Sequence, residues 1–257
     1  FAVIAAIMVL IGLYHIRMLP SNQIPSTTKK TTSEVGRELV AVIANFFTKK
    51  HIFYYICFII LYRLAEGFIM KIAPLFLRAS REVGGLGLSL KEIGTLNGVF
   101  GSAAFVLGSL LASIIGFFSI RKGKGWYIPT LTKRTLFTLC CIFNLPFVAY
   151  TFLAVTQPTN VYLIGTCITM EYFGYGFGFV GLTLFMMQQI APGKHQMSHY
   201  AFASGIMNLG VMLPGMVSGY FSDLLGYRNF FIYVLIATIP AFLITYFIPF
   251  TYDDSKK

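Results

Sequence analysis

Long apolar windows dominate the chain, and short polar or glycine-containing breaks separate them. Three windows (96–120, 136–163 and 230–251) contain no Asp, Glu, Lys or Arg. A helix needs about 20 apolar residues to cross a hydrocarbon core roughly 30 Å thick. The whole pattern therefore predicts six transmembrane helices, at about residues 52–77, 93–118, 134–156, 160–190, 199–221 and 230–250.

The composition agrees with a membrane protein and excludes a soluble one. Apolar residues make up 56% of the chain and charged residues only 11%, whereas soluble domains carry about 25% charged residues. A transmembrane barrel would show alternating segments of roughly ten residues, which are not seen. We therefore predict an all-α integral membrane protein.

Two further segments precede the six predicted spans. Residues 1–14 are apolar and lack an initial Met or a basic leader region, so we expect them to be the end of a transmembrane helix that begins upstream, in a chain that is a fragment. Residues 15–50 are polar, with an amphipathic stretch near 35–47. They are typical of a linker between two bundles that ends in a surface helix, and a plain flexible loop is the alternative for the first half.

The 20 basic residues give a net charge of +11 and are spread unevenly over the predicted loops. Four lie on one side of the membrane, two lie inside the first span, and fourteen lie on the other side: Arg17, Lys29, Lys30, Arg37, Lys49, Lys50, Arg121, Lys122, Lys124, Lys133, Arg134, Lys194, Lys256 and Lys257. Cytoplasmic loops carry the excess of Lys and Arg. We therefore expect the 15–50 linker and the tail 252–257 to be cytoplasmic, and we expect no nucleic-acid partner.

Four ionisable residues fall inside predicted spans, where each costs roughly 2.5–3.5 kcal/mol on insertion scales. Arg63 and Glu66 are three residues apart in the first span and share a helix face, so they can form a charge-assisted contact. Lys71 lies about 140° further round the same helix and can extend toward the interface. Glu171, in the fourth span, has no basic neighbour there.

Glu66 and Glu171 occupy comparable places, because each lies in the first of three consecutive spans. Helix-weakening residues follow both: Gly67 and Pro74 in one case, and Gly174, Gly176, Gly178 and Gly181 in the other. Interrupted helices at matching positions of two inverted repeats indicate the central site of a transporter. A carboxylate in low dielectric favours its protonated form, so either can take up and release a proton. A structural ion pair at Arg63 and Glu66, and a carboxylate bonded to a neighbouring helix at Glu171, are the alternatives.

Other polar and small residues complete the expectations. We add Asn97 and Tyr175 to the predicted substrate and proton path. The spacings Gly94-xxx-Gly98 and Gly215-xxx-Gly219 match a close-packing motif. His195 and His199 have the i, i+4 spacing of a zinc pair, but no third ligand accompanies them, so we predict no metal site. No nucleophile elbow or phosphate loop is present, so we expect neither an enzyme nor a cofactor other than the proton.

Two sets of residues carry a resemblance to known transporters. Residues 219–231 (GYFSDLLGYRNFF) resemble the G-x-x-x-D-x-x-G-x-R loop signature of the major facilitator superfamily, through Gly219, Asp223, Gly226 and Arg228. Residues 61–66 (LYRLAE), 74–77 (PLFL) and 87–97 (GLSLKEIGTLN) are similar to the seventh and eighth helices of AmpG-type muropeptide permeases, and 171–178 (EYFGYGFG) to the tenth. Glu66 stands where that family typically has Asp, which leaves the substrate open.

The resemblance implies a six-helix C-terminal bundle of a major facilitator fold, residues 51–251, built from two inverted three-helix repeats. Residues 1–14 would then end the sixth helix, and an N-terminal half would be the partner bundle. The implied function is proton-coupled import of a muropeptide-like or other polar anionic solute across the bacterial inner membrane by alternating access. The family also includes acetyl-CoA carriers. A non-transporting membrane receptor or subunit, and a drug-type facilitator, are the alternatives.

Overall fold

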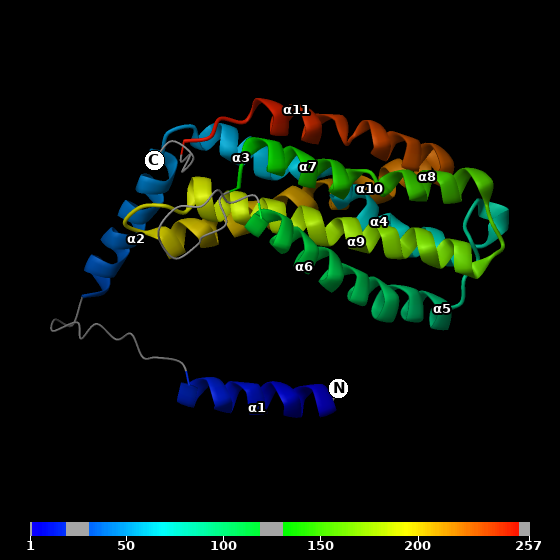
Figure 1. Ribbon diagram of the computed structural model, residues 1–257, viewed down its shortest axis with the longest axis horizontal. Helices are drawn as coiled ribbons and strands as arrows, with labels where there is room; N and C mark the ends of the chain where they lie inside the picture. The colour runs from blue at the N-terminus through cyan, green and yellow to red at the C-terminus, as the bar shows by residue number, and fades with distance from the viewer. Residues whose placement is uncertain (1, 19–30, 119–130, 252–257) are drawn as a thin grey trace. The chain divides into compact units, whose positions relative to one another are not determined.

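A computed structural model describes residues 2–18, 31–118 and 131–251 of the chain (Figure 1). These residues form helices and loops and contain no strand, which confirms the all-α prediction. The chain divides into two units. The first, residues 1–41, contains α1 (Ala2–Met18) and most of α2 (Thr32–Phe47), and the second begins at Val42.

Four helical stretches of the described residues are long and apolar enough to cross a membrane: Ile52–Arg78, Leu90–Ile114, Lys133–Thr156 and Gln196–Phe247. The last has 52 residues, more than twice the roughly 20 that one crossing needs. A further helix of 25 residues, α9 (Val161–Phe185), is not among the four. It carries five glycines and Glu171.

Most of the predicted spans consist of two or three helical segments. The first is α3 (Ile52–Tyr62) and α4 (Leu64–Arg78), followed by the short turn η1 (Arg81–Val83). The second is α5 (Leu90–Thr95), the π-helical η2 (Leu96–Gly101) and α6 (Ser102–Phe118). The third is α7 (Lys133–Asn144) and α8 (Phe147–Thr156), on either side of Pro146. The fourth is α9 with the π-helical η3 (Met186–Ile190). Helix α10 (Gln196–Ile236) includes the fifth span and the start of the sixth, and α11 (Ile239–Phe247) is the rest of the sixth.

The predicted break between the last two spans, 199–221 and 230–250, coincides with a kink between two helices, and this kink is a single residue rather than a loop. Only Gly226, with φ 70° and ψ 160°, leaves the helical conformation. That combination is essentially restricted to glycine, so one residue suffices to turn the chain. Beyond it, α11 packs against α3 and α7, and Figure 1 shows it returning along them.

The second unit is held together by pairs of helices and an aromatic core. The most extensive contacts between helices are those of α4 with α10 and of α6 with α9, and α7 also packs on α9. Between them lies a set of fully buried aromatic side chains: Tyr55, Phe58, Tyr62, Phe76, Phe143, Phe147, Phe185, Phe230 and Phe231. The Tyr62 and Phe143 rings stack at 5.4 Å, which joins α3 to α7. These contacts fix α3, α4 and α9 relative to one another.

The glycines expected to interrupt helices instead let helices approach each other, so the expected interruptions are wrong. Helix α4 continues through Gly67 and Pro74, and α9 continues through its glycine series. A Cβ atom on Gly176 would lie 2.4 Å from the carbonyl oxygen of Phe105 in α6. A Cβ on Gly67 would lie 2.7 Å from the carbonyl oxygen of Val211 in α10.

The glycines of the two predicted close-packing motifs differ from Gly67 and Gly176. A Cβ atom added to Gly94, Gly98 or Gly219 would have no neighbouring atom of the described residues within 4 Å. Only Gly215 is close to another helix, where it meets the side chain of Lys71. Within the described residues, the close-packing prediction therefore fails at three of its four glycines.

Candidate functional site

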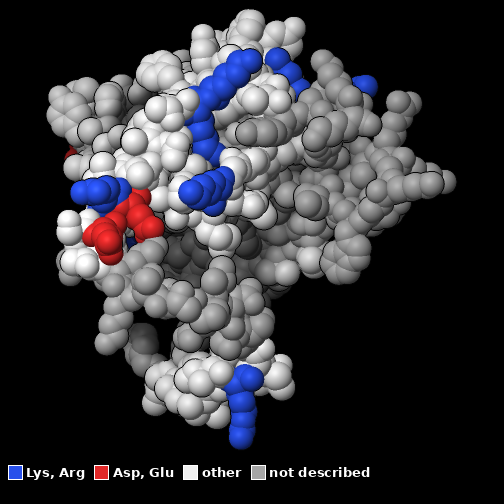
Figure 2. Space-filling model, turned by 90° about the vertical axis from the view of Figure 1, so that its left-hand side faces the viewer, with Lys and Arg blue, Asp and Glu red and all other residues white. Residues whose placement is uncertain are grey.

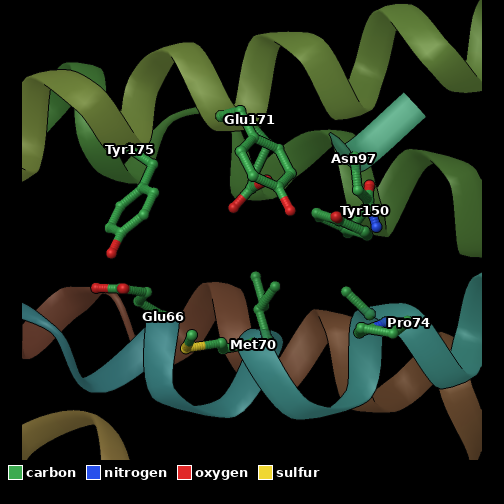
Figure 3. A pocket seen from close by; sticks show the side chains of 10 residues that line it. Glu66, Met70, Pro74, Asn97, Tyr150, Glu171 and Tyr175 are labelled. Atoms are coloured by element: carbon green, nitrogen blue, oxygen red, sulfur yellow. The ribbon is translucent and has the colours of Figure 1, made fainter. Parts of the chain in front are cut away.

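A pocket lies between α4 and α9 in the second unit (Figure 3). Its volume is about 130 Å³. Five of its lining residues come from α4, three come from α9, and η2 and α8 contribute one each. The full lining is Glu66, Ile69, Met70, Ala73, Pro74, Asn97, Tyr150, Glu171, Tyr172 and Tyr175. Four of the six residues of the predicted path, Glu66, Asn97, Glu171 and Tyr175, thus meet in one cavity.

The break between α3 and α4 places the ion pair at the edge of this pocket. Arg63 leaves the helical conformation, with φ −105° and ψ 10°, and its side chain folds onto Glu66 in the first turn of α4. Nε of Arg63 donates a hydrogen bond of 2.6 Å to Oε2 of Glu66, and Nη2 donates to Oε1. Both side chains are only 7% exposed. The pair is therefore bidentate and buried, the geometry in which Arg binds carboxylates most strongly.

Tyr175 connects this pair to α9. Nη2 of Arg63 donates a hydrogen bond of 3.2 Å to the hydroxyl of Tyr175, and the guanidinium carbon lies 5.9 Å from the centre of the Tyr175 ring. Because the Tyr175 oxygen accepts from Arg63, its own proton remains free to be donated into the pocket. The contact joins α4 to α9 across the cavity.

Glu171 is the second carboxylate of the pocket and differs from Glu66 in having no cationic partner. No hydrogen bond or ion pair to its carboxylate is found among the residues that the structure describes. Figure 3 shows its side chain directed from α9 into the cavity, toward α4. Two carboxylates therefore line the pocket, and Arg63, which is not part of the lining, neutralises one of them.

Asn97 provides an unsatisfied acceptor. Its Oδ1 atom is buried and has no hydrogen-bond partner in the described part of the chain. Asn97 lies in the π-helical segment η2, a distortion that is frequent at functional sites. Buried polar atoms are rarely left unpaired, so Asn97 Oδ1 is suited to a donor from a bound ligand.

The structure does not bring Lys71 to the pocket. Its side chain is exposed and lies against Gly215 of α10, and it is not part of the cavity lining. The residues of the loop signature, Gly219, Asp223, Gly226 and Arg228, are exposed as well and do not line the cavity.

Sequence reasoning missed several lining residues. Met70 and Pro74 follow Glu66 at intervals of four, so helical spacing alone could have placed them on the same face. Tyr172 is the neighbour of Glu171. Tyr150 carries no such signal, because it reaches the pocket only through the packing of α8 on α9.

Basic side chains hold α9 at both of its ends. At one end, the guanidinium of Arg81 donates to the carbonyl oxygens of Gln157 and Pro158, each at 2.8 Å. At the other, Nζ of Lys49 donates to the carbonyls of Ile190 and Pro192 at 2.5 and 2.7 Å. Burial lowers the pKa of Lys49. Figure 2 shows that lysine and arginine side chains are spread over this end of the molecule.

The two histidines at this end have partners other than a metal. Their rings lie 5.9 Å apart, and Nε2 of His199 lies 3.4 Å from the carbonyl oxygen of Val42. No group of three or more His, Cys, Asp or Glu side chains with metal-binding geometry is present among the described residues.

Comparison with known proteins adds the family context. No family model matches the chain. It is 21% identical over 224 residues to the anhydromuropeptide permease of Escherichia coli (strain K12), covering 86% of this chain and 41% of that protein. It is 25% identical over 239 residues to the putative transporter AmpG 1 of Rickettsia bellii, covering 93% and 53% of the two chains. The chain is AmpG-like.

A third relative, the putative transporter AmpG 2 of Rickettsia prowazekii, is 26% identical over 82% of this chain and 47% of its own length. The AmpG-like chain thus spans about half the length, or less, of these curated relatives. Their names describe permeases and transporters rather than enzymes. The predicted resemblance to AmpG-type permeases is confirmed, and these names agree with the prediction that the chain is not an enzyme, whereas the resemblance to the major facilitator superfamily stays a prediction.

Proposed function

We propose that this AmpG-like chain forms part of a secondary transporter that carries a muropeptide-like or other polar solute across the bacterial inner membrane. The observation that carries the proposal is the pocket between α4 and α9, which is lined both by Glu66, the buried partner of Arg63, and by the unpaired Glu171. Ionisable residues inside membrane spans are expensive and are typical of ion and substrate pathways. The relative from Escherichia coli is named an anhydromuropeptide permease, which favours that class of solute.

In this proposal, Glu171 is the proton-binding group. The Arg63 guanidinium already neutralises Glu66, whereas none of the described residues gives Glu171 a cationic partner. Protonation removes that uncompensated charge, so the occupancy of the proton site and the conformation of the transporter are coupled. Alternating access then couples the release of the proton to the movement of the solute.

The same proposal covers the topology. Residues 51–251 form a six-helix bundle of the major facilitator type, helices seven to twelve, with residues 1–14 ending helix six and 15–50 linking the two bundles. The excess of basic residues near Lys49, Lys133 and Lys194 favours a cytoplasmic location for the linker and for the tail 252–257. An N-terminal bundle provides the opposite wall of the solute path.

Uptake into vesicles tests this function. Vesicles containing the protein are given a pH gradient, and uptake of a radiolabelled anhydromuropeptide is measured for the wild type, Glu171→Gln and Glu66→Gln. Glutamine has the same shape but cannot ionise, so we expect pH-driven uptake to fall by at least about tenfold, the factor given by 1.4 kcal/mol. Glu82→Gln, at an exposed carboxylate in η1, is the matched control and should transport normally.

The outcome also separates the alternatives. Wild-type uptake in Glu171→Gln would refute the proton role of Glu171, and wild-type uptake in Glu66→Gln would show that transport does not need the ion pair. Binding of the solute without any uptake in the wild type would instead favour a receptor or subunit that keeps the fold.

A further inference from the structure

The pocket's lining has a composition that transport of a proton alone does not require. Three tyrosine rings, from Tyr150, Tyr172 and Tyr175, surround the cavity together with the thioether of Met70. Figure 3 shows the Tyr175 side chain directed from α9 toward α4, with the Tyr150 ring beside Asn97. The faces of tyrosine rings attract cations, and ligand ammonium groups are commonly bound by such aromatic cages.

The charges of the pocket favour the same kind of ligand. Arg63 uses its guanidinium on Glu66 and Tyr175, so the pocket offers no unengaged cation to an anionic group. Glu171 has a carboxylate without a partner, and Asn97 has a buried acceptor without a donor, both within the described residues. A ligand that carries one positive charge and several N–H donors would satisfy both.

The size of the cavity limits what can enter. With a volume of about 130 Å³, it suits one small end group of a larger solute better than a disaccharide or a whole peptide.

A bare metal cation is less suitable, because carbon atoms of Ile69, Ala73 and Pro74 form much of the wall, and no group of three or more His, Cys, Asp or Glu side chains that could hold a metal is found among the described residues. An ammonium group needs fewer acceptors and gains from the aromatic faces.

We propose that this pocket is a subsite for a primary ammonium group of the transported solute, held by Glu171 and Asn97 between the rings of Tyr150, Tyr172 and Tyr175. The assignment rests on the proposed transport function for the identity of the solute, but not for the binding itself. It implies that a proton on Glu171 and the ammonium group exclude each other, since protonation removes the charge that binds the cation. Any anionic part of the solute is then bound outside this cavity.

Thermal unfolding of the purified protein in detergent tests the subsite, with methylammonium chloride as the probe and NaCl at equal ionic strength as the reference. A ligand that binds only the folded state raises Tm in proportion to RT ln(1 + [L]/Kd). We expect methylammonium at pH 8 to raise Tm above the NaCl reference, and tetramethylammonium, which has no N–H to donate to Glu171 or Asn97, to raise it less. Equal shifts with NaCl and methylammonium would overturn the ammonium assignment in favour of a general salt effect.

Variants locate the binding within the pocket. Glu171→Gln should weaken methylammonium binding by about tenfold or more, because it removes the only uncompensated charge among the described lining residues. Tyr150→Phe keeps the ring and should bind nearly normally, whereas Tyr150→Leu removes the ring and should bind several-fold more weakly. Glu82→Gln, outside the pocket, should behave as the wild type. Undiminished binding in Glu171→Gln would refute the proposal.

The pH dependence gives a second, independent readout. Lowering the pH should weaken methylammonium binding in the wild type and leave the residual binding of Glu171→Gln unchanged. If methylammonium does not bind but muropeptide uptake still depends on Glu171, the subsite is refuted and the transport proposal stands. If methylammonium binds as expected but no solute is taken up, the subsite stands and the transport proposal fails.

Discussion

The contact between α6 and α9 allows a quantitative prediction about the glycines of the bundle. Gly108 of α6 is buried, and a Cβ atom added to it would lie 2.2 Å from the carbonyl oxygen of Phe173 in α9. Ordinary contact requires about 3.5 Å, so Gly108→Ala must separate the two helices by roughly 1 Å. Overpacking of this kind typically costs about 1–3 kcal/mol. The atom in the way belongs to the backbone and cannot rotate aside, so we expect the upper part of this range.

The matched control is Gly205→Ala in α10. Gly205 is exposed and has no atom within 4 Å of the added Cβ among the described residues. Alanine is favoured over glycine inside a helix by about 1 kcal/mol, and this gain applies to both variants. We therefore expect Gly108→Ala to be destabilised by about 1–2 kcal/mol net and Gly205→Ala to equal or exceed the wild type in stability.

Denaturant unfolding in detergent micelles, followed by circular dichroism, measures both free energies of unfolding. Phe173 is two residues from Glu171, so the displacement in Gly108→Ala should also reduce pH-driven uptake. Equal stability of Gly108→Ala and Gly205→Ala would refute the reasoning that these glycines exist for close helix packing.

Three further substitutions test the ion pair, the end of α9 and the turn in α10. Arg63→Gln leaves the buried carboxylate of Glu66 unpaired and should lower the free energy of unfolding by about 3–5 kcal/mol. The double variant Arg63→Gln/Glu66→Gln should lower it less. A loss in the double variant equal to the sum of the two single losses would exclude coupling between the residues. Lys49→Met removes the donor to two backbone carbonyls and should cost about 1–3 kcal/mol in thermal unfolding. Burial lowers the pKa of Lys49 in the folded protein. Between this lowered pKa and the ordinary pKa of lysine, the unfolded chain binds more protons than the folded one, so the stability of the wild type should rise with pH there. This rise should be absent in Lys49→Met. Gly226→Ala should lower Tm, since a side chain at φ 70° and ψ 160° costs about 1–3 kcal/mol, and an unchanged Tm would show that the turn tolerates other conformations.

The sequence determined the class of this protein and the chemistry at its centre. Apolar windows of about 20 residues require helices in a bilayer, and the high cost of burying charge made Arg63, Glu66 and Glu171 conspicuous. The pairing of Arg63 with Glu66 also followed from their separation of three residues, although Arg63 lies at the break between α3 and α4 rather than inside one helix. Each of these inferences depends only on residue types and spacings within one short stretch of sequence.

Only the tertiary structure decided which residues meet across helices. Tyr150 enters the pocket from α8, while Lys71, five residues from Glu66, lies outside it against Gly215. The glycines of α9 looked like sites of interruption, yet the helix continues through them because close contacts with α6 and α7 occupy the space of the missing side chains. Such outcomes depend on how far two helices approach and how they are rotated. Those quantities arise from the packing of all their side chains together, and no local stretch of sequence contains them.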